Sequence, residues 1–519
     1  MKNRKPVLIA NRGEIAIRIA RSCKIHGFPT VAVYSEADRN SEHIRHCDRA
    51  YLLGAPAPQA SYLNIEKLLA VAKVSGAGFV HPGYGFLSER PLFVEACEKQ
   101  GLVFVGPTAE SMRLMGDKIQ ARATVDRLKV PRVPGSAGAV KDDQEAKKIA
   151  REIGYPVLLK AAAGGGGKGM RRVDSEAELS SAFASATRES LSAFGDGSLY
   201  VEKLILKPHH VEIQVFGDGK GKAIHLGERE CSIQRRHQKV WEESPAPILK
   251  GFPKTREKMQ EAAVRVAETV KYAGAGTFEF IVDENGNFYF LEMNTRLQVE
   301  HPVTEWVTGV DLVAWQLLLA AGELKLPGVP DARGSSIEVR LYAEDSRTFL
   351  PAPGQLGLIH LPNGPFVRSD SAFSEAGEVS VHYDPMIAKL SVWGQTRDEA
   401  LGRLRVALDE VRIEPPKRLD GTFVGSLRTN LPFLKKLVRN TAVLKGDTAT
   451  DLISAHPELT ATAPLGQKVI TLEGALAVSI AQILADSESG GSQAVNLSDR
   501  KSAPQEVWSW VARNEGVRK

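Results

Sequence analysis

Two glutamates near the middle of the chain are spaced so that they could hold a divalent cation. The segment GTFEFIVDENGNFYFLEMN is two alternating runs around an Asn-Gly pair at 285–286, a strong hairpin signal. If that pair forms the turn, Glu284 faces Asn287. Counting outward along both strands, Glu279 then lies directly opposite Glu292. Opposed like charges repel, whereas Mg²⁺ or Mn²⁺ binds one or two carboxylates with phosphate oxygens. The pair therefore predicts a metal site, with a solvated hairpin face as the alternative.

A row of polar side chains continues from the second of these strands. The stretch EMNTRLQVEHP has polar groups at steps of two, namely Glu292, Asn294, Arg296, Gln298 and Glu300. In extended conformation such groups share one side of the strand. Burying them is costly unless they bind something. The row predicts a ligand-binding face, and an exposed edge strand is the alternative.

The stretch KAAAGGGGKGMR at 160–171 could enclose phosphate groups. An apolar strand, YPVLLKAAA, precedes the glycines, and GMRRV resumes a strand after them. The next helix starts only at Ser175, whose spacing to Glu178 is that of a capping box. Rossmann and Walker A loops run from a strand into a helix, and Gly169 occupies the Ser/Thr position of Walker A, so both are excluded. A hairpin loop closing over phosphates remains; a mobile hairpin without ligand is the alternative.

The elements before this loop alternate between strand and helix. They are VLIA at 7–10, an amphipathic helix at 13–23, TVAVY at 30–34, a helix at 64–76, and LVFVG from residue 102. This rhythm predicts a parallel sheet covered by helices. The first strand is followed by ANRGEIA in place of the dinucleotide fingerprint. The first domain is therefore expected to be Rossmann-like without that phosphate site, and the interruption PRVPGSAGA at 131–139 leads to a second unit.

Composition places the chain among ordinary globular proteins. Of 519 residues, 43% are hydrophobic and 25% charged, and 67 basic against 62 acidic residues give a net charge of +5. The scattered positive charge suits small anions and predicts no nucleic-acid partner. Four cysteines without a C-x-x-C pair favour reduced thiols in the cytoplasm. No apolar run reaches membrane-spanning length, so no membrane association is expected.

Seven motifs in one order carry a family resemblance. They are NRGEIAIRIAR, HPGYGFLSE, MGDK, KAAAGGGGKGMR, ECSIQRRHQKV, LEMNTRLQVEHPVTE and YDPMIAKL. From about residue 5 to about residue 447, the chain resembles the biotin carboxylase component of biotin-dependent carboxylases. The resemblance implies an α/β (α+β) ATP-grasp ligase. Such an enzyme makes carboxyphosphate and ADP from MgATP and bicarbonate, and then carboxylates biotin.

The resemblance also implies a domain order. A Rossmann-like N-terminal domain at 1–116 is followed by a linker and ATP-grasp lid at 117–204. The ATP-grasp core and C-terminal domain occupy 205–450, and an extension fills 451–519. The changes from the family pattern, Trp241 and Pro91, fall on no implied site position.

ATP-binding positions follow from the matching motifs. Phosphate contacts correspond to Lys118, Lys160 and His210, with the glycine loop at Gly165, Gly166, Gly167 and Met170. The adenine hinge corresponds to Glu202, Lys203 and Ile205, and the ribose side to Gln234 and His237. The metal ligands correspond to Glu279, Glu292 and Asn294, which implies Mg²⁺ or Mn²⁺, with two ions expected.

The remaining matches concern bicarbonate and biotin. Bicarbonate corresponds to Lys239 and Arg296 together with Gln298 and Val299. Glu300 matches the base that takes the bicarbonate proton, and a carboxylate flanked by Lys239 and Arg296 should have a lowered pKa. Arg340, in IEVRLYAED, matches the group that stabilises the enolate form of biotin.

Partners are implied by what the sequence contains and lacks. No AMKM-type biotin acceptor occurs in it, so biotin is expected on a separate carrier protein, or free, unless the chain is a fragment. The resemblance implies a carboxyltransferase subunit as second partner and a homodimer as assembly. After residue 450, TLEGALAVSIAQILA predicts an amphipathic helix and SESGGSQ a linker. Partner docking and a peripheral extension remain open for this tail. The final acyl acceptor is not indicated.

Two other functions stay open. A nucleotide sensor derived from this fold would be expected to lose Glu300, Lys239, Arg296 or Arg340, and all are present. Another ATP-grasp ligase acting on a different carboxylate is disfavoured by RLQVEHP and YDPMIAKL.

Overall fold

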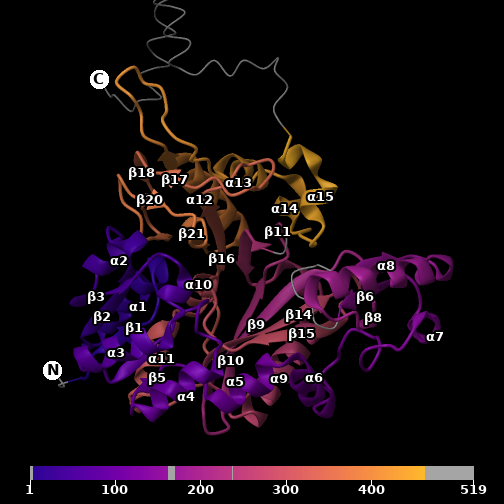
Figure 1. The fold of residues 1–519 in the computed structure, drawn as a ribbon. Coiled ribbons are helices and arrows are strands. Elements are labelled where there is room, and N and C mark those ends of the chain that lie inside the picture. The colour runs from indigo at the N-terminus through magenta and orange to yellow at the C-terminus, as the bar shows by residue number, and fades with distance from the viewer. Residues whose placement is uncertain (1–3, 162–169, 236–237, 462–519) are drawn as a thin grey trace, which may run out of the picture. The chain divides into compact units, whose positions relative to one another are not determined.

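The computed structural model describes residues 4–161, 170–235 and 238–461, and this part of the chain begins with a parallel sheet. Its strand order is β3-β2-β1-β4-β5, and all neighbours are parallel (Figure 1). The strands are β1 Val7–Ile9, β2 Thr30–Ser35, β3 Arg49–Gly54, β4 Phe79–His81 and β5 Val103–Phe104. The covering helices are α1 Gly13–Ile25, α2 Glu42–Arg45, α3 Ile65–Ser75, α4 Pro91–Lys99 and α5 Ala109–Gly116. The predicted Rossmann-like domain is confirmed.

Local signals explain why these helices form where they do. Asn64 accepts a hydrogen bond from the Lys67 N–H at the start of α3, and Gly76 ends that helix in the left-handed conformation at φ 66°. Strand residues such as Leu8 and Val80 are fully buried. They are covered because helices lie on both faces of a parallel sheet.

The turn after β1 holds a neighbouring loop. The Asn11 side-chain amide donates hydrogen bonds to the carbonyls of Pro82 and Tyr84 at 2.7 and 2.8 Å. Gly83 has φ +62°, and a Cβ there would come within 2.9 Å of the Asn11 amide nitrogen. The crevice between β1 and β4, where doubly wound folds often bind ligands, is thus filled by the protein itself.

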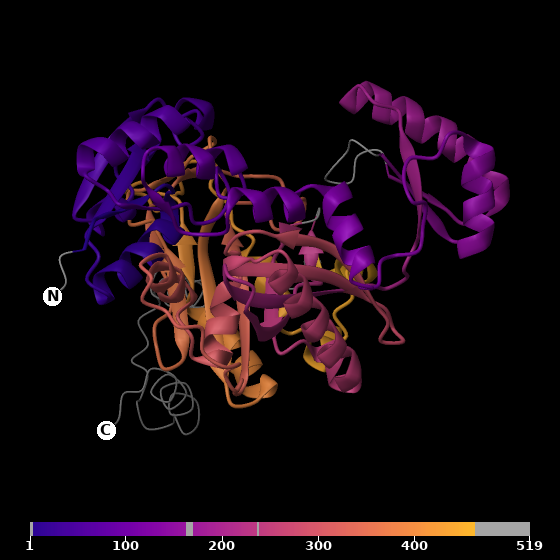
Figure 2. The same cartoon turned by 90° about the horizontal axis from the view of Figure 1, so that it is seen from below.

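A small antiparallel sheet carries the glycine stretch. Its strands, in the order β7-β6-β8, are β6 Val157–Ala161, β7 Arg171–Val173 and β8 Leu199–Lys203. The helices of this lobe are α7 Asp143–Ile153 and α8 Glu176–Phe194, and α6 Lys118–Arg127 leads into it (Figure 2). Leu159 pairs with Arg171, so strands flank the glycines on both sides as predicted. Residues 162–169 lie outside the described chain.

Helix α8 begins one residue after Ser175, as predicted, but with a modified cap. The Glu178 carboxylate accepts hydrogen bonds from the Asp174 N–H and the Ser175 hydroxyl, both at 3.3 Å. The Ser175 side chain itself makes no capping bond to the helix backbone. The predicted capping box is therefore not formed, because the Glu178 carboxylate accepts from the Asp174 N–H and the Ser175 hydroxyl instead of the Ser175 N–H.

The largest sheet of the described chain is antiparallel, in the order β15-β14-β9-β10-β13-β16-β21-β19. Its strands are β9 His209–Asp218, β10 Ala223–Glu230, β13 Trp241–Ser244, β14 Ala273–Val282, β15 Phe288–Asn294, β16 Ser335–Tyr342, β19 Val367–Ser371 and β21 Met386–Gly394. Helices α9 Pro253–Thr269, α10 His301–Thr308 and α11 Leu312–Ala320 pack against it. Phe278 and Phe280 share a hydrophobic core with Met259 and Val266 of α9, which leaves the other side of β14 for polar groups.

The described chain closes with helices on the C-terminal half of this sheet. They are α12 Arg397–Glu410, α13 Leu431–Leu437, α14 Thr441–Lys445 and α15 Leu452–Ala455. Short paired strands complete it: β11 Gln234–Arg235 with β12 Gln238–Lys239, β17 Gly354–Gln355 with β20 Glu378–Val379, and β18 Leu358–His360 with β22 Arg412–Glu414.

The compact unit ends later than residue 450. Leu452 and Leu459 belong to the C-terminal core, and the Lys436 ammonium donates to the Ala461 carbonyl at 2.6 Å. The first compact unit therefore runs through Ala461. The helix and linker predicted in the tail beyond it lie outside the described residues. Among the described helices, none is both long and apolar enough to span a bilayer.

The β14–β15 hairpin turns differently from the prediction. The Asp283 N–H donates to the Asn287 carbonyl at 2.9 Å, and Gly286 has φ 77°. Asp283 therefore faces Asn287, and the predicted pairing of Glu284 with Asn287 is wrong. The loop contains one residue more than a two-residue turn.

A bulge further along restores the register. Val282 pairs with Phe288 near the turn, one residue out of the predicted alignment. Leu291 is then the extra residue of a bulge, and beyond it Glu279 pairs with Glu292 as predicted. The expected carboxylate pair exists because two single-residue deviations cancel.

Candidate active site

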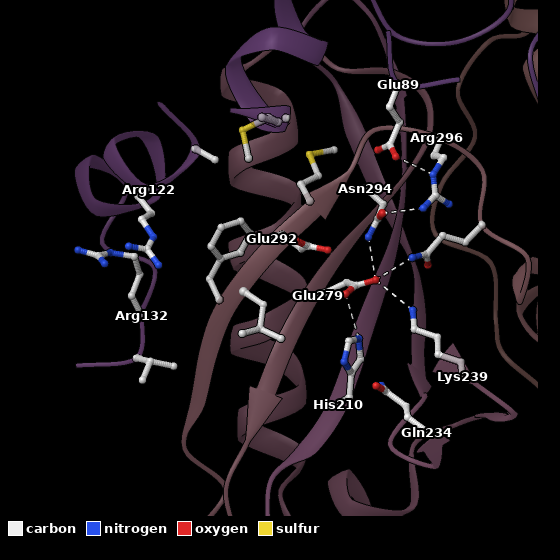
Figure 3. A pocket seen from close by; sticks show the side chains of 18 of the residues that line it. Glu89, Arg122, Arg132, His210, Gln234, Lys239, Glu279, Glu292, Asn294 and Arg296 are labelled. Atoms are coloured by element: carbon white, nitrogen blue, oxygen red, sulfur yellow. Dashed lines mark hydrogen bonds and ion pairs between the residues drawn. The ribbon is translucent and has the colours of Figure 1, made fainter. Parts of the chain in front are cut away.

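A polar cavity of about 790 Å³ lies between the small sheet and the β9–β14–β15 side of the large sheet. Figure 3 shows side chains that line it, among them His210, Lys239 and Glu279. Many residues singled out by sequence line it. They are Lys160, Met170, Glu202, His210, Gln234, Lys239, Glu279, Glu292, Asn294, Arg296, Gln298, Val299, Glu300 and Arg340. Positions spread over 180 residues of sequence thus meet in one space.

Other predicted residues are placed elsewhere or lie outside the described chain. The Lys203 ammonium donates to the carbonyls of Gly154 and Tyr155, both at 2.9 Å, and neither Lys203 nor Ile205 lines the cavity. Lys118 begins α6, but its side chain is outside the described part. Four further predicted residues lie entirely outside the described part of the chain, namely Gly165, Gly166, Gly167 and His237.

The Glu279 carboxylate lies among donors from three elements. Its Oε1 accepts from the Asn294 amide at 2.7 Å, the Gln298 amide at 2.8 Å and the Lys239 ammonium at 3.0 Å (Figure 3). Burial disfavours its charged form, but Lys239 and His210 hold the pKa of Glu279 well below its usual range. The group is therefore anionic at neutral pH.

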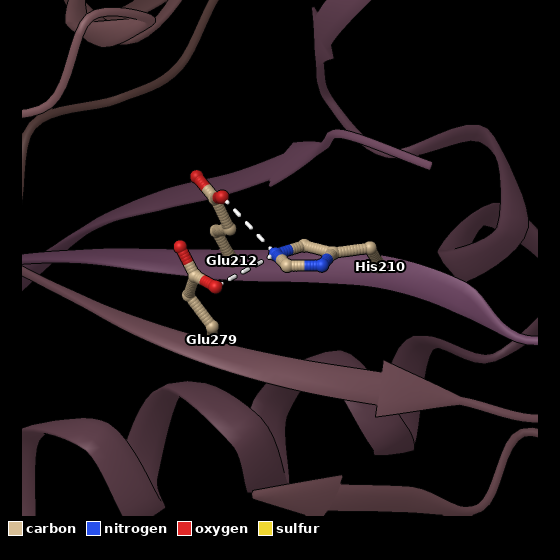
Figure 4. A group of neighbouring side chains, drawn as sticks. All are labelled: His210, Glu212 and Glu279. Atoms are coloured by element: carbon tan, nitrogen blue, oxygen red, sulfur yellow. Dashed lines mark ion pairs between the residues drawn. The ribbon is translucent and has the colours of Figure 1, made fainter. Parts of the chain in front are cut away.

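His210 bridges two carboxylates (Figure 4). Its Nε2 lies 3.2 Å from Glu212 and 3.1 Å from Glu279. Burial acts to lower its pKa, but the charge of Glu279 and the closeness of both carboxylates raise the pKa of His210 to about 9. The imidazolium therefore places positive charge on the cavity wall, where a phosphate oxygen would be stabilised.

Glu212 is a site residue that the sequence analysis missed. It is fully buried and also accepts from Arg229 Nε and Nη2 at 3.1 and 3.0 Å, and from Lys239. The alternation of His210, Glu212 and Gln214 in HHVEIQ puts all three on one face of β9 and could have identified it.

The oxygen donors of the hairpin fit a hard cation. Glu279 and Glu292 are paired across β14 and β15 and line the cavity, and carboxylate oxygens at this spacing suit Mg²⁺ or Mn²⁺. The Asn294 amide nitrogen donates to Glu279 at 2.7 Å, and its oxygen accepts from Arg296 Nη2 at 2.9 Å. Asn294 thus supports Glu279, and its own oxygen already has a partner.

Two other clusters bring potential ligand atoms within 4.8 Å of one another. They are His210, Glu212 and Glu279, and Glu212, Cys231 and Glu300. Lys239 contacts all three carboxylates, so their charges are already compensated. Burial also raises the pKa of the Cys231 thiol well above its usual value, which keeps this thiol protonated at neutral pH.

Glu300 lies at the end of the polar row between two cations. Lys239 Nζ is 2.7 Å and Arg340 Nη2 is 3.0 Å from its carboxylate, which is 2% exposed. Burial opposes its ionisation, but Lys239 and Arg340 lower the pKa of Glu300 to about 2. The lowered pKa was expected, although the second cation was not.

Arg296, the flanking cation that the sequence suggested, has other partners. Its Nε donates to Glu89 at 2.8 Å and its Nη2 to Asn294 at 2.9 Å. Glu89 itself lines the cavity and was missed by the sequence analysis. The predicted pairing of Glu300 with Arg296 is therefore replaced by one with Arg340.

The polar row is not one straight strand. Strand β15 ends at Asn294, and an irregular segment leads to α10, which begins directly after Glu300. The Lys389 ammonium, 1% exposed, donates to the Val299 carbonyl at 2.8 Å and so holds this segment. The groups converge because the segment turns, which simple alternation does not predict.

Lys160, at the root of the glycine stretch, pairs with Glu202 of β8. Their charged atoms are 2.5 Å apart, and Arg122 of α6 donates to the other Glu202 oxygen at 2.7 Å.

The two departures from the family pattern lie away from the cavity. Trp241 is buried and Pro91 is the first residue of α4, and neither lines the cavity.

A three-stranded lobe and a hairpin with paired carboxylates, on either side of a charged cavity, are the arrangement of an ATP-grasp ligase. The sequence matches three family descriptions in succession. They are the biotin carboxylase N-terminal domain over residues 3–112, the carbamoyl-phosphate synthase L chain ATP-binding domain over 117–327, and the biotin carboxylase C-terminal domain over 338–455. The chain belongs to the biotin carboxylase family.

Relatives of known identity agree. The chain is 50% identical over 444 residues to the biotin carboxylase of Pseudomonas aeruginosa, covering 85% of this chain and 96% of the relative. It is 47% identical over 455 residues to that of Halalkalibacterium halodurans, covering 87% and 98%. It is 49% identical over 455 residues to the methylcrotonoyl-CoA carboxylase subunit alpha of Mus musculus, covering 87% of this chain but 62% of that longer protein.

Solved structures show the same fold. The biotin carboxylase of Campylobacter jejuni, in complex with a β,γ-ATP compound, is 45% identical with a TM-score of 0.80, over 87% of this chain and 99% of that one. The biotin carboxylase domain dimer of Hydrogenobacter thermophilus 2-oxoglutarate carboxylase, with MgADP and bicarbonate, is 44% identical with a TM-score of 0.80, over 88% and 99%. The activity of this family is the ATP-dependent carboxylation of biotin.

Proposed function

We propose that this chain carboxylates biotin with ATP and bicarbonate through the side chains that converge on the cavity. The observation that carries the proposal is the position of Glu300, an ionised carboxylate held between Lys239 and Arg340 in the space that Glu279 and His210 also line. A base, anion-binding cations and a metal-binding hairpin therefore share one cavity.

The ATP phosphates are assigned to Lys160, His210 and the glycine stretch, and the nucleoside to the Glu202 and Gln234 side of the cavity. Glu279 and Glu292 would hold Mg²⁺ or Mn²⁺, which supplies charge neutralisation on the phosphates when bound. The cationic His210 and Lys160 add positive charge where the transferred phosphoryl group develops negative charge.

Bicarbonate is assigned to Lys239, Arg296 and the segment around Gln298 and Val299. Glu300 accepts the bicarbonate proton, and the freed oxygen attacks the γ-phosphorus while the bond to ADP breaks, which yields carboxyphosphate and ADP. Arg340 then stabilises the negative charge on the biotin ureido oxygen during carboxyl transfer. Since the pKa of Glu300 is lowered, proton transfer depends on close positioning more than on base strength.

The partners are a biotin carrier protein and a carboxyltransferase subunit, with a homodimer as the assembly and the cytoplasm as the compartment. The similarity to 62% of a longer acyl-CoA carboxylase subunit supports a carboxylase complex, and the dimeric relative supports self-association. The carboxyltransferase determines which acyl-CoA is finally carboxylated.

The test is ATP hydrolysis measured with and without bicarbonate, and then with free biotin added. We expect hydrolysis to require bicarbonate and to rise with biotin. Hydrolysis indifferent to bicarbonate would overturn the carboxylase assignment and favour another ATP-grasp ligase. Nucleotide binding without turnover would favour a sensor.

A further inference from the structure

Arg340 is held on one side by a glutamate that the reaction scheme does not use. Its Nε and its Nη2 both contact Glu242 Oε1, each at 2.6 Å. Its Nη2 also reaches Glu300 at 3.0 Å. Glu242 lies on β13, is fully buried, and does not line the cavity. One edge of the guanidinium is therefore bound behind the cavity, and the remainder points toward it.

We propose that Glu242 is a positioning residue that orients the Arg340 guanidinium toward the ureido oxygen of biotin. A guanidinium is planar, so two contacts along one edge define the direction of its free edge. Arg340 is 7% exposed and lines the cavity, so that free edge meets the substrate space. This inference rests on the proposed function of Arg340.

Glu242 also competes with the base Glu300 for the Arg340 guanidinium. In the described part of the chain, the Arg340 guanidinium forms ion pairs with two carboxylates, those of Glu242 and Glu300. If the Glu242 charge were removed, Glu300 would be the remaining anionic partner. The guanidinium would keep its contact with Glu300, but its free edge would no longer be directed toward the space for biotin. Glu242 thus keeps Arg340 available for biotin.

The energetics favour a positioning role over a stabilising one. Burial raises the pKa of Glu242 to about 7 even though Arg340 opposes this shift. A buried ion pair often contributes little net stability compared with well-packed apolar residues. The Glu242–Arg340 pair is therefore better explained by the orientation that it imposes than by its contribution to folding.

The chain supplies a matched control directly opposite Glu242. Glu338 pairs with it across β13 and β16 and is equally buried. Neither Glu338 oxygen has a hydrogen-bond partner in the described part of the chain, and burial raises its pKa well above the usual value. Glu338→Gln therefore tests the loss of a buried carboxyl at the same place without loss of an arginine contact.

The experiment compares two activities of the full chain in Glu242→Gln and Glu338→Gln. Bicarbonate-dependent ATP hydrolysis without biotin reports on Glu300 and the nucleotide site, and the free-biotin-dependent rate reports on Arg340. Misplacement of a reacting group by about 1 Å can lower a rate about 100-fold. We expect Glu242→Gln to lower the biotin-dependent rate by about that factor and to change the basal hydrolysis less than about threefold. Glu338→Gln should leave both rates near those of the wild type.

An Arg340→Gln background separates orientation from a general effect. If Glu242 acts through Arg340, Glu242→Gln should add no further loss in that background. The same added loss in both backgrounds would overturn the proposal, as would equal effects of Glu242→Gln and Glu338→Gln. If Glu242→Gln does not fold, Glu242→Asp carries the same test, because it keeps the charge but withdraws it from Nε. Equal loss of both activities in Glu242→Asp would also overturn the proposal.

Failure of the proposed function would look different. In that case the wild type itself would show no bicarbonate-dependent hydrolysis or no response to biotin. Thermal unfolding and ADP binding of each variant report whether the fold and the nucleotide site remain intact.

Discussion

The region that follows strands β1 and β2 and the cavity beside β14 and β15 contain the same kinds of charged side chain, but the partners of these charges differ. In the first region, Arg12 pairs with Asp38 at 2.6 and 2.5 Å and stacks on Tyr383 at 4.3 Å. The Tyr62 hydroxyl also donates to Asp38 at 2.5 Å. The charged groups of the first region therefore pair with one another and join separate segments of the fold.

In the second region, charged side chains line the accessible cavity. Glu279 and Glu300 are each held by Lys239, yet both line the cavity together with Arg340. The same ion-pair chemistry therefore locks elements together in one region and prepares groups for a substrate in the other. The two regions differ in whether the charged groups also line an accessible cavity. Variants in the cavity should therefore change turnover, and variants in the first region should change stability.

The largest effect is expected for Glu300→Ala. Removal of the proton acceptor should lower bicarbonate-dependent ATP hydrolysis about 10²-fold to 10⁴-fold. The unfolding temperature should change little, because Lys239 and Arg340 retain Glu212, Glu279 and Glu242 as partners. The assay is steady-state hydrolysis beside a thermal melt. A variant with near wild-type hydrolysis would remove Glu300 from the mechanism.

The opposite pattern is expected for Arg12→Met in the first region. It leaves Asp38, which is 3% exposed, without its guanidinium, and breaking such a buried pair costs about 3 to 5 kcal/mol of folding stability. Turnover per folded molecule should stay unchanged. The control is Arg45→Met, which breaks an exposed pair with Glu42 and should cost at most about 1 kcal/mol. Equal destabilisation by the two variants would contradict this account.

A smaller effect concerns the pH dependence of stability in the first region. His43 is fully buried, with Nδ1 2.8 Å from the Ser41 hydroxyl and Nε2 3.1 Å from the Val33 carbonyl, and burial lowers its pKa to about 4. The unfolded chain takes up this proton near pH 6.5, so stability present above that pH is lost as the pH falls toward 4. At pH 5 the loss should be about 2 kcal/mol relative to pH 8.

Native-state hydrogen exchange of the β2 amides measures this loss. His43→Gln should flatten the dependence between pH 8 and pH 5, whereas His382→Gln, at an exposed position, should not. An unchanged slope in His43→Gln would show that other groups dominate.

The smallest effect is expected for Glu292→Gln in the cavity. Glu292 is an exposed carboxylate paired across the hairpin with Glu279, so its loss should raise the Mg²⁺ concentration for half-maximal hydrolysis about tenfold. Glu284→Gln, near the turn of the same hairpin and 61% exposed at its side chain, is the control and should leave that concentration unchanged. Equal Mg²⁺ requirements in both variants would argue against a metal-binding role of Glu292.

Much of the architecture could be predicted from local sequence. The parallel sheet, the strands on both sides of the glycine stretch and the start of α8 follow from alternation, helix periodicity and capping residues. The pairing of Glu279 with Glu292 was predicted from a two-residue turn and is present for another reason. The turn is one residue longer, and the bulge at Leu291 compensates.

Most of the cavity-lining residues that the sequence analysis named lie in motifs, whereas the residues that it missed are linked to the cavity by tertiary contacts. Glu212 and Glu89 belong to the site through Lys239 and Arg296, which are distant in sequence. Lys203, assigned to the adenine hinge, turns its ammonium toward the Gly154 and Tyr155 carbonyls. A single sequence does not record which distant backbone a long side chain will reach.

The sequence by itself determined the family, the order of elements and the chemical types of the reacting groups, because these depend on residue identity and on spacing along one chain. The tertiary structure decided which charges share a partner. Glu300 pairs with Arg340, whereas Arg296 pairs with Glu89. Of the two opposed glutamates Glu242 and Glu338, it is Glu242 that pairs with Arg340. These choices depend on the pairing of β13 with β16 and on the turn of the segment before α10. A shift of a single residue would reverse which side chains face the cavity, because neighbouring side chains on a strand point to opposite faces.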